Sequence, residues 1–424
     1  MNNPLEQLGQ QARAAAAQLA QTTATQKNAA ITAIIDGLKA AKPTILAANK
    51  QDVTAARANG MTDVLIDRLM LDDKRLDAII QSLNVIQSLP EPVGQLLETT
   101  TRPNGLRIEK RAVPIGVIGI IFEARPNVAV DAAALCLKSG NACILRGGSD
   151  SWNSVRVLIG IVQDALVKAG LPHDAVQTLP SGERTLVGAL LTLDKYVDVI
   201  IPRGGKSLIA RVRDESRIPV FSHLDGICHT YIDAKANAAK AVAITVNAKM
   251  RRTSICGATE CLLLHKNIAA SLGKDIIAAL LQAGCEVRGP GKESGVDFGS
   301  LLPNQPLLKL ASASDYGLEF LAPIIAVAIV PDVQGAVGFI NQYGSQHTDA
   351  IVTEDAEAAD YFLRHVDSAI VLHNASTQFA DGGEFGKGAE IGIATGKLHA
   401  RGPVGLEELT TYQYRVHGSG QVRG

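Results

Sequence analysis

The sequence predicts an α/β protein whose parallel sheets alternate with helices, and three observations support this. From residue 115 to 221, short apolar segments rich in β-branched residues alternate with longer amphipathic ones. The same alternation returns from residue 236 to 372. Such alternation is typical of βαβ units with parallel strands. The chain has 424 residues, more than one core usually holds, so two domains are expected.

The composition excludes several classes of protein. Hydrophobic residues make up 46% of the chain and charged residues 20%, which suits a large core rather than disorder. The net charge is −1, without a basic cluster, so no nucleic-acid partner is expected. The apolar runs are too short to span a bilayer, and the start of the chain lacks the pattern of a signal peptide. We therefore expect a cytoplasmic protein with no membrane partner.

The first ninety residues are rich in Ala and Gln, with apolar residues at helical spacing. Thr62-Asp63 and Leu71-Asp72-Asp73 have the residue types of helix N-caps. Pro90 and Pro92 end this helical block. This pattern predicts an N-terminal set of helices over residues 5–19, 29–48, 53–58 and 75–89.

The next block predicts the first parallel sheet. Its expected strands are 115–122, 142–146, 176–179, 197–201 and 218–221. Its expected helices are 128–138, 152–169, 184–191 and 206–214. A parallel sheet of this kind places ligands at the carboxyl ends of its strands.

A second alternating block predicts a second α/β domain. Its expected helices are 236–250, 268–283, 333–343 and 356–364, and its extended segments are 261–265, 320–330, 350–352 and 369–372. The Gly-rich tail predicts loops and a hairpin. We expect residues 1–235 to form the N-terminal helices and a dinucleotide-binding domain. Residues 236–375 would form the catalytic domain, and 376–424 would return to the first domain and supply an oligomerisation arm.

Cys256 is the candidate nucleophile. Lys249, Arg251 and Arg252 precede it, and positive neighbours lower the pKa of a thiol and raise its thiolate fraction. The small Gly257 leaves room for a substrate carbonyl, and the backbone N–H of Cys256 suits an oxyanion. The alternative is a buried structural cysteine beside a solvated basic turn.

Two glycine turns, each between an expected strand and an expected helix, are candidate cofactor sites. Glycine lets the backbone approach a phosphate, and a helix N-terminus favours an anion. Arg146 could pair with a cofactor phosphate, and a 2′-phosphate would indicate NADP. The alternative is an ordinary capped turn in each case, and the G-x-G-x-x-G fingerprint is absent. The turns comprise Arg146, Gly147, Gly148 and Ser149, and Arg203, Gly204, Gly205 and Lys206.

Arg125 and Asn127 follow the first long strand and could bind a carboxylate, a phosphate or an oxyanion. Pro126 makes an ordinary turn the alternative. The six cysteines form no C-x-x-C pair, and the histidines show no H-x-x-x-H or H-E-x-x-H spacing. No metal site is expected on these grounds.

Taken together, these segments resemble the aldehyde dehydrogenase superfamily and, within it, its gamma-glutamyl phosphate reductase branch. The resemblance runs from about residue 5 to 415. The matching stretches are Pro114–Val128, Lys138–Ala142, Leu145–Ser149, Ile201–Gly205, His223–His229, Asn247–Lys249, Cys256, Tyr343–Ala350, Asp381–Gly386 and Lys397–Leu406.

The resemblance implies a Rossmann-like cofactor domain, an α/β catalytic domain and an oligomerisation arm. It implies NADPH-dependent reduction of L-glutamyl 5-phosphate to L-glutamate 5-semialdehyde and phosphate through a cysteine thioester, the second step of proline biosynthesis from glutamate. Cys256 matches the nucleophile, and Arg146 matches a basic residue near the adenosine ribose. Glu319 resembles the glutamate that holds the nicotinamide ribose. Asn247 and Lys249 are candidates for the substrate or its oxyanion.

The resemblance also implies a homodimer or homotetramer. The chain is too short to include a fused glutamate kinase, so a separate kinase is the expected functional partner. Two departures stand out. The stretch His223–Ile227 lacks the general-base glutamate of hydrolytic aldehyde dehydrogenases, whose activated water would waste a thioester. Gln378 replaces an arginine expected in the branch.

Three alternatives stay open at this point. The first is a hydrolytic NAD-linked aldehyde dehydrogenase, which the missing glutamate disfavours. The second is a reductase acting on another acyl phosphate or acyl-CoA. The third is a catalytically silent binding or scaffolding protein on the same fold, which the intact cysteine and the two glycine turns disfavour.

Overall fold

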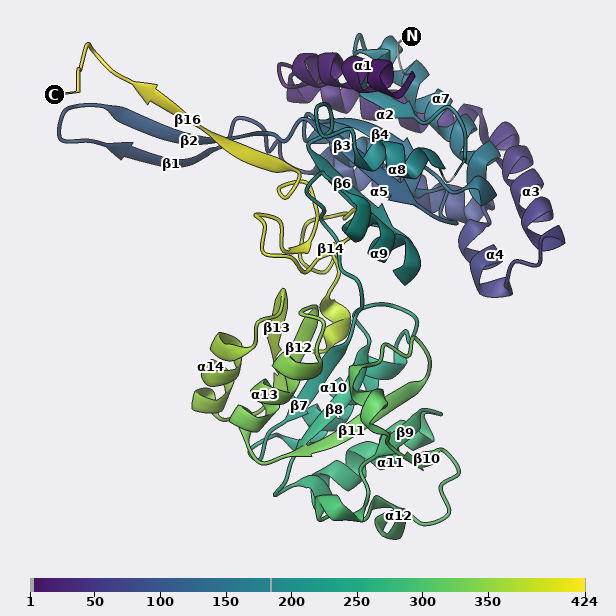
Figure 1. Cartoon of the computed structure of the whole chain (residues 1–424), viewed down its shortest axis with the longest axis vertical. Helices are drawn as coiled ribbons and strands as arrows, with labels where there is room; N and C mark the ends of the chain where they lie inside the picture. The colour runs from purple at the N-terminus through teal and green to yellow at the C-terminus, as the bar shows by residue number, and fades with distance from the viewer. Residues whose placement is uncertain (1–3, 184, 424) are drawn as a thin grey trace. The chain divides into compact units, whose positions relative to one another are not determined.

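The computed structural model describes residues 4–183 and 185–423, which form two compact units (Figure 1). Unit 1 holds the chain up to Ser222, together with Gly386–Ile393 and the segment from Lys397 onward. Unit 2 holds His223–Phe385 and Ala394–Gly396. The division falls after Ser222, whereas the sequence suggested one at residue 235. No helix among the described residues is long and apolar enough to cross a membrane.

Unit 1 contains a four-stranded parallel sheet in the order β5-β4-β3-β6. Its strands are buried apolar segments, as expected for a sheet covered on both faces. The expected strand at 218–221 makes only one isolated bridge, Ile200 to Val220, because Pro219 has no N–H to donate to a ladder. The strands are β3 (Val117–Phe122), β4 (Ala142–Arg146), β5 (Val176–Thr178) and β6 (Val199–Arg203).

Three helices connect these strands and a fourth follows the last of them, as the alternating pattern predicted. α6 and α7 pack on the sheet, and α9 follows β6. The expected helix at 184–191 is present from Thr185, while Arg184 lies outside the described residues. The four are α6 (Val128–Lys138), α7 (Trp152–Lys168), α8 (Thr185–Leu191) and α9 (Lys206–Glu215).

Five N-terminal helices form a further layer, in which α2, α3 and α5 pack against α6 and α7. The expected single helix over 29–48 is wrong: one helix ends before Ala41 and a new one begins after it. Pro43 lies in the first turn of that helix, where its missing N–H breaks no bond. The helices are α1 (Pro4–Leu19), α2 (Ala24–Ala40), α3 (Lys42–Ala58), α4 (Asp63–Leu69) and α5 (Asp73–Ser88).

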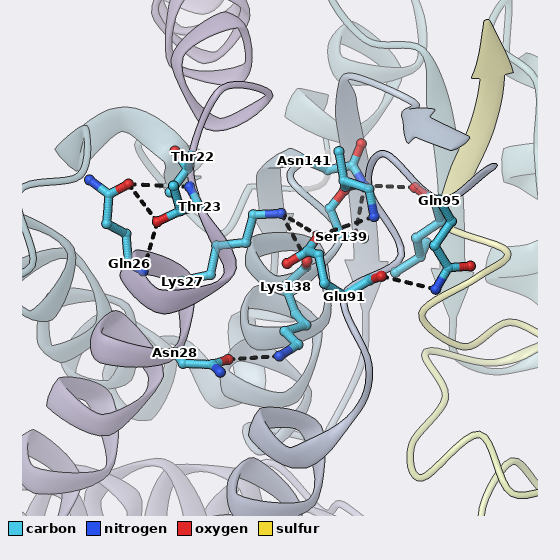
Figure 2. Close-up of polar contacts among 12 residues, drawn as sticks. Thr22, Thr23, Gln26, Lys27, Asn28, Glu91, Gln95, Lys138, Ser139 and Asn141 are labelled. Carbon is cyan, nitrogen blue, oxygen red and sulfur yellow. Dashed lines mark hydrogen bonds and ion pairs between the residues drawn. The ribbon is translucent and has the colours of Figure 1, made fainter. Parts of the chain in front are cut away.

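Two buried lysines join the N-terminal helices to α6 (Figure 2). Lys27 of α2 donates to Glu91 at 2.8 Å and to the carbonyl of Lys138 at 3.3 Å. Lys138 of α6 donates to Asn28 at 2.7 Å and to the carbonyl of Gln87 at 3.0 Å. Burial lowers the pKa of Lys138. Because buried ammonium groups need such partners, these bonds fix α2, the end of α5 and the end of α6 together.

A three-stranded antiparallel sheet extends from the rest of unit 1 (Figure 1). Its central strand β2 (Arg107–Pro114) pairs with β1 (Leu96–Thr101) on one side and β16 (Thr410–His417) on the other. β16 thus pairs with a strand about three hundred residues away rather than forming the local hairpin expected in the tail. The hairpin lies between β1 and β2, in a segment without a clear sequence pattern.

Unit 2 is built on a seven-stranded, all-parallel sheet in the order β10-β9-β11-β8-β7-β12-β13. Along β8, Leu262 and Leu264 face one core while Cys261 and Leu263 face another. The strands are β7 (Cys228–Ile232), β8 (Thr259–His265), β9 (Glu286–Gly289), β10 (Leu308–Leu310), β11 (Ile324–Val330), β12 (Thr348–Val352) and β13 (Ile370–His373).

The two cores of unit 2 lie under different helices. One contains residues of α10 and α11, and the other contains residues of α13 and α14. β7 was not predicted from the sequence, because its residues mix polar and apolar types although all are buried. The helices are α10 (Ala238–Met250), α11 (Lys274–Gln282), α12 (Phe298–Leu301), α13 (Val333–Tyr343) and α14 (Ala356–His365). Two short strands, β14 (Ile393–Ala394) and β15 (Gly402–Pro403), complete the regular structure.

Candidate active site

Cys256, His223 and His347 form a cluster in unit 2. Each lies shortly before a strand: Cys256 before β8, His223 before β7 and His347 before β12. These three strands are neighbours and parallel, so the residues meet at the amino edge of the sheet. The sulfur and one nitrogen of each imidazole all lie within 4.8 Å of one another. The two rings meet edge to face, with centroids 4.9 Å apart.

The imidazoles favour the thiolate form of Cys256. Burial works to raise the pKa of the thiol, but the nearby imidazoles of His347 and His223, first of all the charge of His347, outweigh it and hold the pKa well below its usual range. The expected direction is confirmed, although the cause is different. Arg251 and Arg252 are exposed, and the two histidines are the groups that lower the pKa.

His347 is fully buried, and its two ring nitrogens have different surroundings. Nδ1 lies 2.9 Å from the hydroxyl of Thr348. Nε2 is buried and finds no hydrogen-bond partner among the described residues. A proton on Nδ1, donated to Thr348, leaves Nε2 with a free lone pair. Such an arrangement suits a base or a ligand atom.

Glycine residues allow the chain to pass close to Cys256. A Cβ on Gly226 would lie 2.6 Å from the Cα of Cys256, so only glycine fits there. A Cβ on Gly257 would lie 3.0 Å from the carbonyl oxygen of Thr377 and 3.3 Å from Ala380. Gly257 therefore makes room for a neighbouring chain segment, and this corrects the expectation that it makes room for a substrate carbonyl.

Glu319 lies beside the same cluster. Its carboxylate accepts a hydrogen bond from the N–H of Gly226 at 2.9 Å. Burial raises the pKa of Glu319, and the nearby charge of Cys256 raises it further. The hydrogen bond from Gly226 lowers this pKa but does not outweigh them. Two residues on, Leu321 has a φ of 51°, a left-handed conformation that non-glycine residues rarely adopt. Strain of this kind gathers at functional sites.

Lys249 is fully buried, and its ammonium group donates to the buried carboxylate of Glu260. Burial raises the pKa of Glu260 to about 7, although Lys249 lowers it. Asn247, two residues earlier on α10, is exposed and lines a shallow groove with Met250 and Ala283. The structure thus gives Lys249 a partner within the protein, and it places Asn247 outside the cluster around Cys256.

Gln378, one of the departures noted in the sequence, supports the segment that carries Cys256. Its side chain is buried, and its amide donates to the carbonyls of Ala248 at 2.8 Å and Arg252 at 3.2 Å. These bonds fasten the end of α10 and the turn before the cysteine. Gln378 therefore acts on the shape of the loop that carries Cys256.

In unit 1, the loops after the parallel strands meet at the carboxyl edge of the sheet, as predicted. Arg146 is buried and donates to the carbonyl of Gly182, in the loop after β5, at 3.0 Å. A Cβ on Gly182 would lie 3.2 Å from the Cα of Ser149, after β4. The N–H of Gly205, after β6, donates to Glu123, after β3, at 3.2 Å.

This edge suits the anionic part of a dinucleotide. α9 begins at Lys206 with Gly205 as its N-cap, and no side chain caps it. The Nε atom of Arg203 is buried and has no hydrogen-bond partner within the described chain. Uncapped N–H groups and an unmatched guanidinium nitrogen both suit a phosphate. Gly147 and Gly148 are buried in the turn after β4, and Ser149 is exposed beside them.

Arg125 and Asn127 lie in a strained turn between β3 and α6. Ala124 has a φ of 45°, again in the left-handed region. Asn127 donates to Asp131 at 3.1 Å. Burial raises the pKa of the Asp131 carboxyl to about 6, although the bond from Asn127 lowers it. Arg125 is half-buried. The turn thus holds Asn127 in one orientation at the carboxyl edge.

A family model described as the aldehyde dehydrogenase family matches residues 3–319. Gamma-glutamyl phosphate reductase from Rhodospirillum rubrum is 52% identical over 416 residues, covering 98% of this chain and 96% of that protein. The enzyme of the same name from Sphingopyxis alaskensis is 54% identical over 419 residues, covering 99% and 95%.

A solved structure agrees with these relatives. The crystal structure of gamma-glutamyl phosphate reductase from Thermotoga maritima superposes with a TM-score of 0.95 at 41% identity, and it covers 100% of both chains. The α/β architecture described above is thus that of a known crystal structure over its whole length.

Proposed function

The chain belongs to the aldehyde dehydrogenase family and, within it, to the gamma-glutamyl phosphate reductases, and from this membership we propose its reaction. The enzyme reduces L-glutamyl 5-phosphate to L-glutamate 5-semialdehyde and phosphate with NADPH, in the cytoplasm, as the second step of proline biosynthesis from glutamate. The observation that carries the proposal is the cluster of Cys256 with two imidazoles, which favours a thiolate.

The first step is acyl transfer to Cys256. The thiolate attacks the carbonyl carbon of the acyl phosphate, a carbon–sulfur bond forms, and the carbon–oxygen bond to phosphate breaks. The departing phosphate needs a proton, and His223 or His347 is placed to supply one. The backbone N–H of Cys256 and the side chains of Arg125 and Asn127 are the proposed ligands of the oxyanion and the substrate. Lys249 acts through Glu260 on the position of the α10–β8 segment.

The second step releases the aldehyde. NADPH, when bound, supplies a hydride to the thioester carbonyl. The resulting hemithioacetal oxyanion collapses, the carbon–sulfur bond breaks, and Cys256 leaves as the thiolate. No activated water is needed, which agrees with the missing general-base glutamate in the stretch from His223 to Ile227. A nearby base that activated water would instead hydrolyse the thioester.

The cofactor residues are proposed from the carboxyl edge of unit 1 and from Glu319. The uncapped start of α9 at Gly205 and Lys206, with Arg203, would hold the pyrophosphate. Arg146 would contact the adenosine ribose and its 2′-phosphate. Glu319 would hold the nicotinamide ribose. The other proposed contacts are Gly147, Gly148, Ser149 and Gly204.

We also propose that the enzyme is a homodimer or homotetramer joined through the β1–β2–β16 sheet. β16 is an edge strand, and Tyr412, Tyr414 and Val416 are 48%, 59% and 57% exposed on one of its faces. An apolar edge strand left uncovered would aggregate, so a second copy is its expected partner. The acyl phosphate would come from a separate glutamate kinase.

The reverse reaction tests the function. We expect the purified protein to reduce NADP⁺ with glutamate 5-semialdehyde only when phosphate is present. Cys256→Ala should lower the rate by at least about 1,000-fold, because the covalent step is lost. Cys143→Ala, which removes a buried thiol in unit 1, is the matched control and should keep the activity. A rate independent of phosphate would support the hydrolytic alternative, and full activity in Cys256→Ala would refute the mechanism.

A further inference from the structure

We propose that His223, Cys256 and His347 form an inhibitory site for Zn²⁺. No sequence pattern indicates this site, because the three residues come from three separate loops and share no short spacing. The fold brings them together at the amino edge of the unit 2 sheet, with their potential ligand atoms within 4.8 Å of one another. Such a site would take the reactive thiolate out of use whenever the metal is bound.

The donor set matches what Zn²⁺ prefers. Two imidazole nitrogens and one thiolate sulfur are borderline-soft ligands, and three protein ligands with an open fourth position are a common arrangement. Tetrahedral zinc with bonds of about 2.1 Å to nitrogen and 2.3 Å to sulfur places its ligand atoms about 3.5 Å apart. Closing the cluster from 4.8 Å thus needs shifts of about 1 Å. Cys256 and His223 are only half-buried, which leaves them space for such shifts.

His347 has the surroundings of a metal-binding histidine. Such residues usually donate their second ring N–H to an oxygen, which fixes the tautomer and aims the other nitrogen at the metal. Here Nδ1 lies 2.9 Å from the hydroxyl of Thr348. Nε2 is buried and has no hydrogen-bond partner in the described part of the chain, so its lone pair is available. Among the described residues, this nitrogen is therefore left to serve Cys256 or a ligand of Cys256.

The metal and the acyl group compete for the same sulfur. Zinc binding uses the lone pair with which Cys256 attacks the substrate, and a thioester on Cys256 removes the zinc ligand. Zinc should therefore inhibit reversibly, and a chelator should restore the activity. Unlike oxidation of the thiol, this inhibition needs no electron acceptor and no reductant for recovery.

Cobalt is the probe, because Co²⁺ bound to a thiolate absorbs through ligand-to-metal charge transfer whether or not the enzyme turns over. We expect wild-type protein to bind one Co²⁺ per chain with this band, and Zn²⁺ to displace it. Cys256→Ala should abolish the band. His223→Ala and His347→Ala should each weaken Co²⁺ binding by more than the roughly 10–100-fold typical of an outer-shell change. His365→Asn removes an exposed imidazole of α14 and should change nothing.

A further test uses wild-type protein alkylated at Cys256 with iodoacetamide. It involves no substitution and therefore does not depend on whether a histidine variant folds. The alkylated protein should show no charge-transfer band. Equal Co²⁺ binding by the alkylated protein or by Cys256→Ala would overturn the proposal, and so would unchanged affinity in both histidine variants. Because this readout is absorption, its failure is distinct from failure of the proposed reaction, which phosphate-dependent turnover tests.

Discussion

At the residue scale, the character of Cys256 depends on groups distant in the sequence. His347 and His223 counter the effect of burial on the thiol, while the adjacent arginines are exposed. The sequence singled out Cys256 as the candidate nucleophile from its own segment. It could not indicate the imidazoles, because each histidine read alone is more often structural, and only the register of β7, β8 and β12 brings them together. Their presence in His223–His229 and Tyr343–Ala350, both stretches matched to the family, was the available signal.

The lowered pKa predicts how alkylation of Cys256 depends on pH. A thiol with a pKa near 8.5 loses about fiftyfold in thiolate between pH 8.5 and 6.5. Cys256 should lose less than about threefold over that range, because a depressed pKa keeps the thiolate until the pH falls through the lower value. The measurement is the rate of iodoacetamide labelling, which is specific here because the other five cysteines are buried.

His347→Ala should move the inflection of this rate to higher pH, because it removes the larger of the two histidine contributions. His365→Asn, at an exposed imidazole, should leave the profile unchanged. An unshifted profile in His347→Ala would show that the imidazole does not stabilise the thiolate.

Gln378 offers a second test at this scale. Gln378→Ala leaves the carbonyls of Ala248 and Arg252 without their donor, which should cost about 1–3 kcal/mol in the free energy of unfolding. Because these carbonyls lie in the segment leading to Cys256, kcat should fall while KM for the aldehyde changes less. Urea unfolding and steady-state kinetics measure both. Gln334→Ala, at an exposed position of α13, should alter neither, and a normal kcat in Gln378→Ala would refute the positioning role.

At the element scale, the buried pair of Lys249 and Glu260 joins α10 to β8. Lys249→Met leaves a buried carboxylate without its partner, so unfolding should become easier by about 3–5 kcal/mol. The double variant Lys249→Met with Glu260→Gln should recover most of that stability, because no unpaired charge remains. Urea denaturation measures both effects.

The same double variant separates two roles for Lys249. If its role is to position the α10–β8 segment, the double variant should recover activity along with stability. If the ammonium group eases the charge of the departing phosphate, activity should stay low in a stable protein. The structure favours the first outcome, since the ammonium group already has a buried partner.

Elements whose apolar residues repeat at a clear helical or strand spacing were predicted from the sequence. Elements that depend on partners distant in the sequence were not. The helices Val128–Lys138 and Val333–Tyr343 and the strand Ala142–Arg146 have the predicted bounds, because each has a continuous apolar pattern and a clear stop. The three-stranded arm was missed as a unit, because its exposed strands carry no core pattern and β16 finds its partner far along the chain. Pro43 was overlooked as a helix start.

At the scale of the whole molecule, the two units use opposite edges of their parallel sheets. In unit 1, the loops at the carboxyl ends of the strands gather the glycine turns, as the general rule predicts. In unit 2, Cys256, His223 and His347 precede their strands and lie at the amino edge. The rule therefore predicted where the glycine turns of unit 1 lie, but it does not predict the position of the cysteine cluster in unit 2.

The proposed assembly gives the last prediction. Tyr414 and Val416 lie on one exposed face of β16, and its outer edge is unpaired within the described part of the chain. Tyr414→Glu with Val416→Glu places two carboxylates on that face, and burying them at an interface would cost several kcal/mol. Light scattering after size exclusion should show a dimer or tetramer for the wild type and a smaller species for the variant.

Gln413→Glu provides the matched control, because Gln413 is exposed on the other face of the same strand. It adds a carboxylate to β16 without touching the apolar face, so the mass in solution should stay that of the wild type. A monomeric wild type would refute the proposed assembly, whereas an unchanged mass in the double variant would place the interface elsewhere. Dissociation by Gln413→Glu as well would show that charge on the strand, rather than loss of the apolar face, disrupts the assembly.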